Sequence, residues 1–262
     1  MKSKIVENAR VVENLQMTDD VYSMILETEI ADMAKPGQFV ALYSNSDSKI
    51  LPRPISICDF SDGRIRLVYR VVGEGTYEFS NLKEGDTIKV MGPLGNGYPI
   101  ENLNSDSKVT LVGGGVGVPP LLALAKTLSN NGIKNINCVL GFRNEDDIFL
   151  EDDFEEYSDV TITTDDGSAG FHGNTVSFLQ NVEEKSDVIY SCGPKIMLHF
   201  LKEYANEKGI KLFVSLEEKM ACGIGSCLAC VCKSKNVDNH SKVHNKRVCK
   251  DGPVFDAEEV EL

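Results

Sequence analysis

The sequence of 262 residues contains no tryptophan and far fewer basic than acidic residues. Lysine and arginine number 27 against 40 aspartates and glutamates, so the formal net charge is −13. This excess of negative charge disfavours a nucleic-acid or anionic-membrane partner. The chain also lacks an apolar run of the roughly 18–20 residues that a membrane span requires. We therefore expect a cytoplasmic protein, long enough for two domains and a small addition.

Four of the eight cysteines lie near the C-terminus with an informative spacing. Cys222, Cys227 and Cys230 follow the pattern Cys-x4-Cys-x2-Cys, and Cys249 stands further along the chain. This spacing is typical of the ligands of a plant-type [2Fe–2S] cluster. Two glycines between the first two cysteines permit the tight loop and the close backbone approach that inorganic sulfides need. The spacing predicts that these four thiolates hold such a cluster.

Other uses of the cysteines remain open at this point. A structural zinc site can use four cysteines, but it is usually built from two short knuckles, and only one tight group is present here. Disulfides are disfavoured because the chain opens with polar residues and no apolar signal segment. Cys232 alternates with Cys230 in a strand-like run, so alternation alone does not exclude it as a ligand. We leave it out because the pattern is complete at Cys230.

The segment from about residue 5 to residue 98 has an all-β pattern. Short alternating or apolar runs, separated by glycine-containing turns, occur at 21–26, 38–42, 64–72 and 87–90. Regular short strands with such turns predict a small antiparallel barrel.

From Lys108 the pattern changes to alternating strands and helices. We expect strands at 109–112, 136–141, 160–164 and 188–191, and helices at 121–128, 175–180 and 195–208. This order predicts a doubly wound parallel α/β sheet with ligands at the carboxyl ends of its strands. The fold class is therefore α+β and multi-domain. We expect a barrel at 1–100, an α/β domain at 101–213 and a cluster-binding subdomain at 214–262.

A glycine-rich loop joins the first expected strand of the α/β domain to its first helix. Such a loop offers free N–H groups and a helix start to a pyrophosphate. The signal is weak alone, because it is not the full G-x-G-x-x-G fingerprint and such loops often serve tight packing. Two further turns follow the third and fourth strands, where a ligand crossing the sheet edge would be met. Together these segments predict a nucleotide site that includes Gly113, Gly114, Gly115, Gly117, Asp166, Gly167, Cys192, Gly193 and Pro194.

The barrel region carries a third motif, Arg53-Pro54-Ile55-Ser56. The arginine can hold a phosphate as a fixed cation, and the serine hydroxyl can bind the edge of a heterocycle. Gly75 and Thr76 follow a strand and can add N–H contacts to a pyrophosphate. Taken alone, each of these segments is more often an ordinary turn or loop.

The order of these parts resembles the ferredoxin–NADP reductase superfamily, and the added cysteine loop resembles the electron transfer subunits of NAD-dependent (class 1B) dihydroorotate dehydrogenases. The resemblance covers essentially the whole chain. Its most specific segments are 51–57, 69–76, 91–97 and 247–255.

The resemblance implies a set of cofactors and roles. It implies FAD on the barrel, held by Arg53, Pro54, Ile55, Ser56, Tyr69, Arg70, Val71, Gly75 and Thr76. It implies NAD(H) as an exchangeable substrate at the glycine loop and the two later turns. The cluster would link this FAD to an FMN-containing catalytic subunit, in a heterotetramer with two copies of each chain, within pyrimidine biosynthesis. The acidic run Glu145-Asp146-Asp147 favours NADH over NADPH, since a 2′-phosphate would be repelled.

Two alternatives are retained. One is a related flavin and iron–sulfur subunit, that of an NADH-dependent ferredoxin:NADP oxidoreductase or of a sulfide dehydrogenase. The resemblance implies that those relatives can carry an acidic residue at the position of Cys222. A cysteine at this position therefore favours the dihydroorotate system. The other is a zinc-stabilised binding module without redox function. We also expect the polar segment 233–247 to form a solvated hairpin, with His240 and His244 as surface residues.

Overall fold

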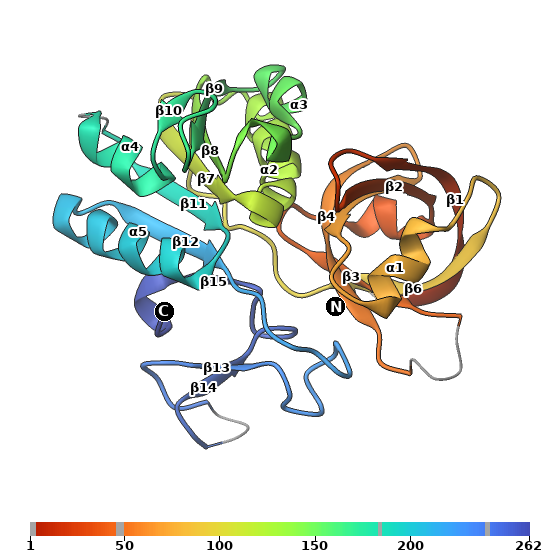
Figure 1. The fold of residues 1–262 in the computed structure, drawn as a ribbon. Coiled ribbons are helices and arrows are strands. Elements are labelled where there is room, and N and C mark those ends of the chain that lie inside the picture. The colour runs from red at the N-terminus through yellow and green to blue at the C-terminus, as the bar shows by residue number, and fades with distance from the viewer. Residues whose placement is uncertain (1–3, 46–49, 183–184, 239–241) are drawn as a thin grey trace.

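The structure is a computed structural model that describes residues 4–45, 50–182, 185–238 and 242–262. The N-terminal part is a closed antiparallel barrel in the strand order β1-β2-β5-β4-β3-β6, drawn in red to yellow in Figure 1. Alternation places side chains such as Val11, Leu26 and Leu67 inside, where they are fully buried. The strands are β1 (Ile5–Gln16), β2 (Val21–Glu27), β3 (Phe39–Tyr43), β4 (Arg53–Ser61), β5 (Arg64–Arg70) and β6 (Thr87–Leu94).

The barrel contains short helical segments that the sequence pattern did not indicate. These are the 3₁₀ segment η1 (Glu29–Met33) and helix α1 (Glu74–Ser80). Helix α1 begins within the segment that was expected to be a loop after a strand. Its sequence EGTYEFS has no helical hydrophobic period long enough to reveal it.

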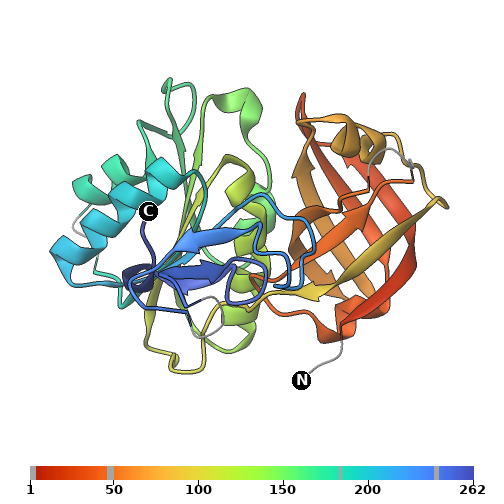
Figure 2. The same cartoon turned by 90° about the horizontal axis from the view of Figure 1, so that it is seen from below.

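The predicted doubly wound sheet is confirmed, with the strand order β10-β9-β8-β7-β11-β12-β15, where β15 (Val254–Asp256) comes from the C-terminal part of the chain. Helices α4 and α5 cover one face, and α2 lies on the other face, between the sheet and the barrel (Figure 2). The strands are β7 (Lys108–Gly114), β8 (Asn135–Phe142), β9 (Asp159–Thr164), β10 (Phe171–His172), β11 (Val188–Cys192) and β12 (Lys211–Ser215). The helical segments are η2 (Gly115–Gly117), α2 (Pro119–Asn130), η3 (Glu145–Asp147), α3 (Glu151–Glu155), α4 (Thr175–Asn181) and α5 (Lys195–Lys208).

The barrel and the sheet unit are held together along β4 and α2. Lys126 Nζ on α2 lies 2.7 Å from Asp59 Oδ2 on β4, and Arg66 Nη1 on β5 lies 2.5 Å from Asp153 Oδ1 on α3. Cys58, next to a register shift in the β4–β5 pairing, is fully buried among side chains of both units. The interface therefore combines apolar packing with two ion pairs.

The C-terminal part contacts both larger units. It contains β13 (Val231–Lys233), β14 (Asn245–Arg247), β15 (Val254–Asp256) and η4 (Ala257–Glu259). β15 adds antiparallel to β12 at the sheet edge, and the loops before it lie across the boundary with the barrel (Figure 2). The exact domain boundaries stay predictions.

The expected hairpin in the polar segment is formed by β13 and β14, in which Val231 pairs with Arg247. His244 is exposed, as expected, and its Nδ1 lies 2.9 Å from the Lys235 carbonyl oxygen. His240 lies outside the described residues. No helix in the ranges that the structure covers is both long and apolar enough to cross a membrane.

Candidate functional site

The glycine loop and the Cys-Gly-Pro turn meet at the carboxyl edge of the sheet. Gly113 at the end of β7 pairs with Cys192 at the end of the parallel neighbour β11. A Cβ on Gly117 would lie 2.4 Å from the Cys192 carbonyl oxygen, closer than real Cβ atoms come. Only glycine therefore permits this approach. Helix α2 begins directly after the loop with Pro119 and Pro120, which have no N–H group, and the Leu121 N–H donates to the Val118 carbonyl oxygen at 3.0 Å. The N–H groups that a ligand could meet here are therefore those of the glycine loop.

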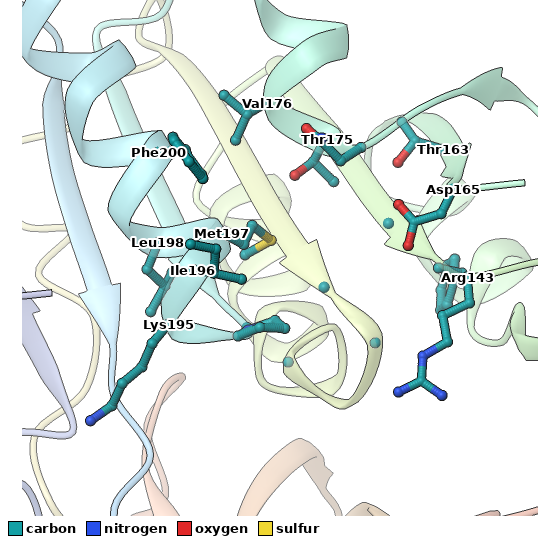
Figure 3. Close-up of a pocket in the computed structure, with 18 of the residues that line it drawn as sticks. Arg143, Thr163, Asp165, Thr175, Val176, Lys195, Ile196, Met197, Leu198 and Phe200 are labelled. Carbon is teal, nitrogen blue, oxygen red and sulfur yellow. The ribbon is translucent and has the colours of Figure 1, made fainter.

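A cavity of about 820 Å³ opens at this edge, a size typical of small-molecule sites (Figure 3). Thr163, Asp165 and Arg143 lie on one side of it, and Met197 and Phe200 of α5 lie on the other (Figure 3). Of the residues predicted for a nucleotide, the cavity brings together Gly114, Gly115, Gly117, Gly193 and Pro194.

Two buried hydroxyl groups in this cavity have no hydrogen-bond partner in the described part of the chain. They are Oγ1 of Thr163 near the end of β9 and Oγ1 of Thr175 at the start of α4. A buried hydroxyl without a partner costs about 1–3 kcal/mol. A polar ligand in the cavity would supply the missing partners, and the hydroxyl-rich, glycine-lined walls thus fit a nucleotide. Sequence reasoning missed both threonines; the signal that could have located Thr175 is the helix-capping Asn174 just before it.

The structure does not bring Asp166 and Gly167 into the cavity. The Asp166 carboxylate accepts hydrogen bonds from Ser168 N at 2.9 Å and Ser168 Oγ at 2.6 Å, and these bonds lower the pKa of Asp166. Its neighbour Asp165 lines the cavity instead. Cys192 is buried behind the edge, and this burial holds the pKa of its thiol well above the usual range.

On the barrel, Arg53 and Gly75 form a small cradle. A Cβ on Gly75 would lie 2.2 Å from Arg53 Nε, so the guanidinium lies directly over this glycine. Thr76 Oγ1 accepts hydrogen bonds from the N–H groups of Val72 at 3.0 Å and Gly73 at 3.3 Å, which fixes the turn that presents Gly75. A fixed cation beside the N–H groups at the start of α1 fits the pyrophosphate of a dinucleotide.

The other residues predicted for FAD are placed differently. Pro54, Ile55 and Ser56 are half-buried at the start of β4. The ring of Tyr69 lies inside the barrel, stacked on Tyr22 with ring centroids 6.1 Å apart, so only its backbone can reach a ligand. Val71 is half-buried just after β5, whereas Arg70 lines the cavity at the sheet edge.

The four predicted cluster ligands lie in two pairs. Cys227 is hydrogen-bonded to the thiol of Cys222, and the Cys249 N–H donates to Cys230 Sγ at 3.4 Å. Within the described ranges, no group of three or more His, Cys, Asp or Glu side chains converges on a single ion position. Two pairs suit a cluster with two irons, each of which takes two thiolates. Cys227 is exposed, whereas Cys230 and Cys249 are buried.

Backbone N–H groups point at the first pair. Ile224 N lies 3.5 Å and Ser226 N 3.4 Å from Cys222 Sγ. Burial raises the pKa of Cys222, but hydrogen bonds from this loop outweigh burial and lower the pKa to about 6. Burial and the neighbouring Cys230 raise the pKa of Cys249 to about 12. Iron would offset that effect, because a coordinating thiol is deprotonated outright.

Arg247 joins the cluster loop to the turn that carries Cys249. Its buried guanidinium donates to the Gly225 carbonyl oxygen at 3.3 Å and to both carboxylate oxygens of Asp251 at 2.9 and 3.0 Å. Gly225 has a φ of +84°, a conformation that favours glycine. Cys232 lies in β13 opposite Lys246, and burial raises the pKa of its thiol to about 11.

Comparison with known families agrees with this geometry. The family model of the iron–sulfur cluster binding domain of dihydroorotate dehydrogenase B matches residues 217–261. The family model of the oxidoreductase NAD-binding domain matches residues 111–203.

Individual proteins resemble the chain over nearly its whole length. It is 41% identical to the dihydroorotate dehydrogenase B (NAD(+)) electron transfer subunit of Fusobacterium nucleatum, over 98% of this chain and 99% of that protein. It is 44% identical to the subunit of that name from Listeria innocua, over 97% of this chain and 98% of that protein.

Solved structures show the same fold. The structure of an NADH-dependent reduced ferredoxin-NADP oxidoreductase aligns with a TM-score of 0.85 at 35% identity, covering 97% of this chain and 89% of that one. A flavohemoglobin from Malassezia yamatoensis aligns with a TM-score of 0.70 at 21% identity, covering 80% and 59%, which shows the fold alone. The chain matches the models of both the cluster-binding and the NAD-binding domain, and it is 41% and 44% identical to the Fusobacterium nucleatum and Listeria innocua subunits over nearly its whole length. The chain therefore belongs to the family of dihydroorotate dehydrogenase B (NAD(+)) electron transfer subunits.

Proposed function

We propose that this chain carries electrons between NAD(H) and the FMN of a dihydroorotate dehydrogenase catalytic subunit, through FAD and a [2Fe–2S] cluster. The observation that carries the proposal is the adjacency of the sites. The cluster loop packs on the barrel at Gly223, where an added Cβ would lie 3.3 Å from both Met91 and Leu94. Those residues lie on β6, which pairs with β3, and β3 pairs with β4, the strand that begins with Arg53–Ser56.

The residues divide the work between three positions. Arg53 and Gly75 would hold the FAD pyrophosphate, and Ser56 would approach the reactive edge of the flavin. The glycine loop and the Cys-Gly-Pro turn would hold NAD(H), with Thr163 and Thr175 as partners for its polar groups. The paired thiols would hold the cluster. FAD supplies hydride exchange with the nicotinamide, and the cluster supplies one-electron transfer; the protein positions both and excludes competing reactions.

The test is cofactor analysis of the chain purified without oxygen. We expect one FAD, two irons and two sulfides per chain, and loss of the flavin absorbance when NADH is added. NADPH in the same experiment should bleach the flavin more slowly, because Asp147 and Asp165 line the cavity and would repel a 2′-phosphate. Zinc in place of iron, with no flavin, would show that the proposal is wrong.

The catalytic partner would dock over the cluster loop. Ile224 and Leu228 flank the exposed Cys227, and these two residues are 43% and 40% exposed. Apolar groups left exposed beside an electron exit suit a protein interface, in which a few such side chains supply most of the binding energy. The assembly would contain two copies of each chain.

We expect Leu228→Asp to reduce the NAD-dependent dihydroorotate oxidation of the reconstituted complex by about tenfold or more, as for the loss of a central interface contact. NADH bleaching of the isolated chain should not change. Leu15→Asp is the matched control. Leu15 is also an exposed leucine, with 54% of the residue accessible, but it lies on barrel strand β1 and not in the cluster loop. Equal losses in both variants would contradict docking at the cluster loop. The measurements are the steady-state rate and the partner affinity.

A second candidate is the role of an NADH-dependent reduced ferredoxin-NADP oxidoreductase subunit, favoured by the structural match at 35% identity. The cysteine at position 222 favours the dihydroorotate system. Reduction of FMN in a purified dihydroorotate dehydrogenase catalytic subunit, compared with reduction of ferredoxin, separates the two roles.

A further inference from the structure

The side chain of Arg247 links the two segments that carry the predicted cluster ligands. Arg247 is the last residue of β14, two residues before Cys249, and only 6% of it is exposed. Its Nη1 donates to the Gly225 carbonyl oxygen at 3.3 Å, across 22 positions of the sequence. Gly225 lies between Cys222 and Cys227 in the cluster loop. One guanidinium therefore joins the loop of the first thiol pair to the turn of the second.

Asp251 fixes the orientation of this guanidinium. Arg247 Nε lies 2.9 Å from Asp251 Oδ2 and Nη2 lies 3.0 Å from Oδ1, so the two groups form a planar fork. Asp251 Oδ2 also accepts a hydrogen bond from the Arg247 backbone N–H at 2.8 Å. These bonds would be enough to stiffen the turn. The third nitrogen, Nη1, is directed away from the turn, to the carbonyl oxygen of Gly225.

The peptide group between Gly225 and Ser226 carries the effect of Arg247 to the first thiol pair. The C=O and N–H bonds of a planar trans peptide point in opposite directions. Here the Gly225 carbonyl faces Arg247, and the Ser226 N–H of the same peptide group faces Cys222 Sγ, with N and Sγ 3.4 Å apart. A glycine lets the adjacent peptide group rotate easily, so an external contact is needed to fix it. By holding the carbonyl, Arg247 directs the N–H at the sulfur.

The same glycine also affects the second thiol pair. Burial and the neighbouring Cys230 raise the pKa of Cys249, whereas a hydrogen bond from the Gly225 backbone acts in the lowering direction. Hydrogen bonds to the sulfurs are one of the factors that set the reduction potential of an iron–sulfur cluster. Each transfer from NADH-reduced FAD adds one electron and no proton, so the negative charge at the sulfurs grows. Donors directed at the sulfurs stabilise that charge and raise the potential.

The positive charge of Arg247 has a smaller direct effect than the orientation of this peptide group. The carboxylate of Asp251 is bound in the fork, and that of Asp238 lies 3.9 Å from Nη2. Two carboxylates so close to one guanidinium offset its field at the cluster loop. The hydrogen bonds that Arg247 directs therefore outweigh its charge.

We propose that Arg247 is a positioning residue for electron transfer, which holds the Gly225–Ser226 peptide group so that its N–H faces a ligand sulfur of the cluster. This contact raises the reduction potential of the cluster and slows the loss of iron. The inference rests on the proposed function. Asp251 acts with Arg247, since the fork leaves Nη1 directed at the loop.

The test compares Arg247→Met and Arg247→Lys with the wild type, each purified without oxygen. We expect Arg247→Met to lower the equilibrium constant for one-electron reduction of the cluster by about tenfold, or about 59 mV in midpoint potential. Iron retention against a chelator should weaken by about tenfold or more, as for the loss of an outer contact of a metal site. Arg247→Lys should change less in the same direction, because one ammonium cannot replace the planar fork and the Gly225 contact together.

Three measurements follow these effects. They are a redox titration monitored by electron paramagnetic resonance, the rate of iron release, and deuterium exchange of the segment 223–228 by mass spectrometry. Exchange of this segment should be faster in Arg247→Met, because the Ser226 N–H loses its fixed orientation. If Arg247→Met holds no cluster, the potential of Arg247→Lys decides, and a potential equal to that of the wild type overturns the inference.

Lys246→Met is the matched control, because it removes the same charge from the neighbouring position of β14. Lys246 pairs with Glu259 at 2.8 Å, and its loss should leave the equilibrium constant within about twofold of the wild type. Equal changes in Lys246→Met and Arg247→Met would show that charge, and not peptide orientation, sets the potential, which overturns the inference. If the wild type holds zinc or no metal, the proposed function fails instead. Deuterium exchange needs no cluster and then still shows whether Arg247 fixes the loop.

Discussion

Replacement of Cys249 by alanine should abolish the iron–sulfur cluster. The iron content should fall from about two per chain to near zero, because the second pair of thiolates loses one member and an iron with three ligands is not retained. Electron transfer from NADH to the catalytic partner should disappear with the cluster. Oxidation of NADH by an artificial acceptor that takes electrons directly from FAD should continue. Iron and sulfide analysis, the visible spectrum and the two assays measure these outcomes.

Cys232→Ala is the matched control for this experiment. Cys232 is also a buried thiol of the C-terminal part, but it lies in β13 opposite Lys246 and outside the two pairs. Its loss should leave iron and sulfide unchanged. A cluster that survives in Cys249→Ala but not in Cys232→Ala would show that the fourth ligand was assigned to the wrong cysteine. FAD content and the melting temperature of both variants check that the chain is still folded.

Replacement of Gly117 by alanine should weaken NAD(H) binding by about 10- to 100-fold. The new Cβ would lie 2.4 Å from the Cys192 carbonyl oxygen and 2.6 Å from Gly193 Cα, so the two turns must separate. Overpacking of this kind costs about 1–3 kcal/mol, and each 1.4 kcal/mol changes a binding constant tenfold. The KM for NADH should rise, while the contents of FAD and iron stay at wild-type levels.

Gly132→Ala tests whether a general loss of stability explains that result. Gly132 follows the far end of α2, where an added Cβ meets no atom within 4 Å, although its φ of +84° makes any substitution mildly strained. We expect a small decrease in melting temperature and no change in the KM for NADH. A KM that rises equally in both variants would contradict a local role for Gly117.

The sequence by itself determined the features that are local in the chain. The Cys-x4-Cys-x2-Cys spacing, the change from short strands to alternating strands and helices, and the glycine loop before Pro119 each lie within a few residues. Strand and helix periods and ligand spacing follow from backbone geometry, which neighbouring residues set. The predicted helix at 195–208 therefore coincides with α5, and the fold class is confirmed.

Only the tertiary structure decided which distant residues meet. The guanidinium of Arg53 lies over Gly75. The unpartnered hydroxyls of Thr163 and Thr175 lie in the same cavity. Arg70 belongs to the barrel but lines the cavity of the sheet unit. The ring of Tyr69 points into the barrel core. No local pattern records these relations, because the closure of the barrel and the docking of α2 on β4 set them. The chain carries its chemistry in short motifs, and packing between its units decides which motif each side chain serves.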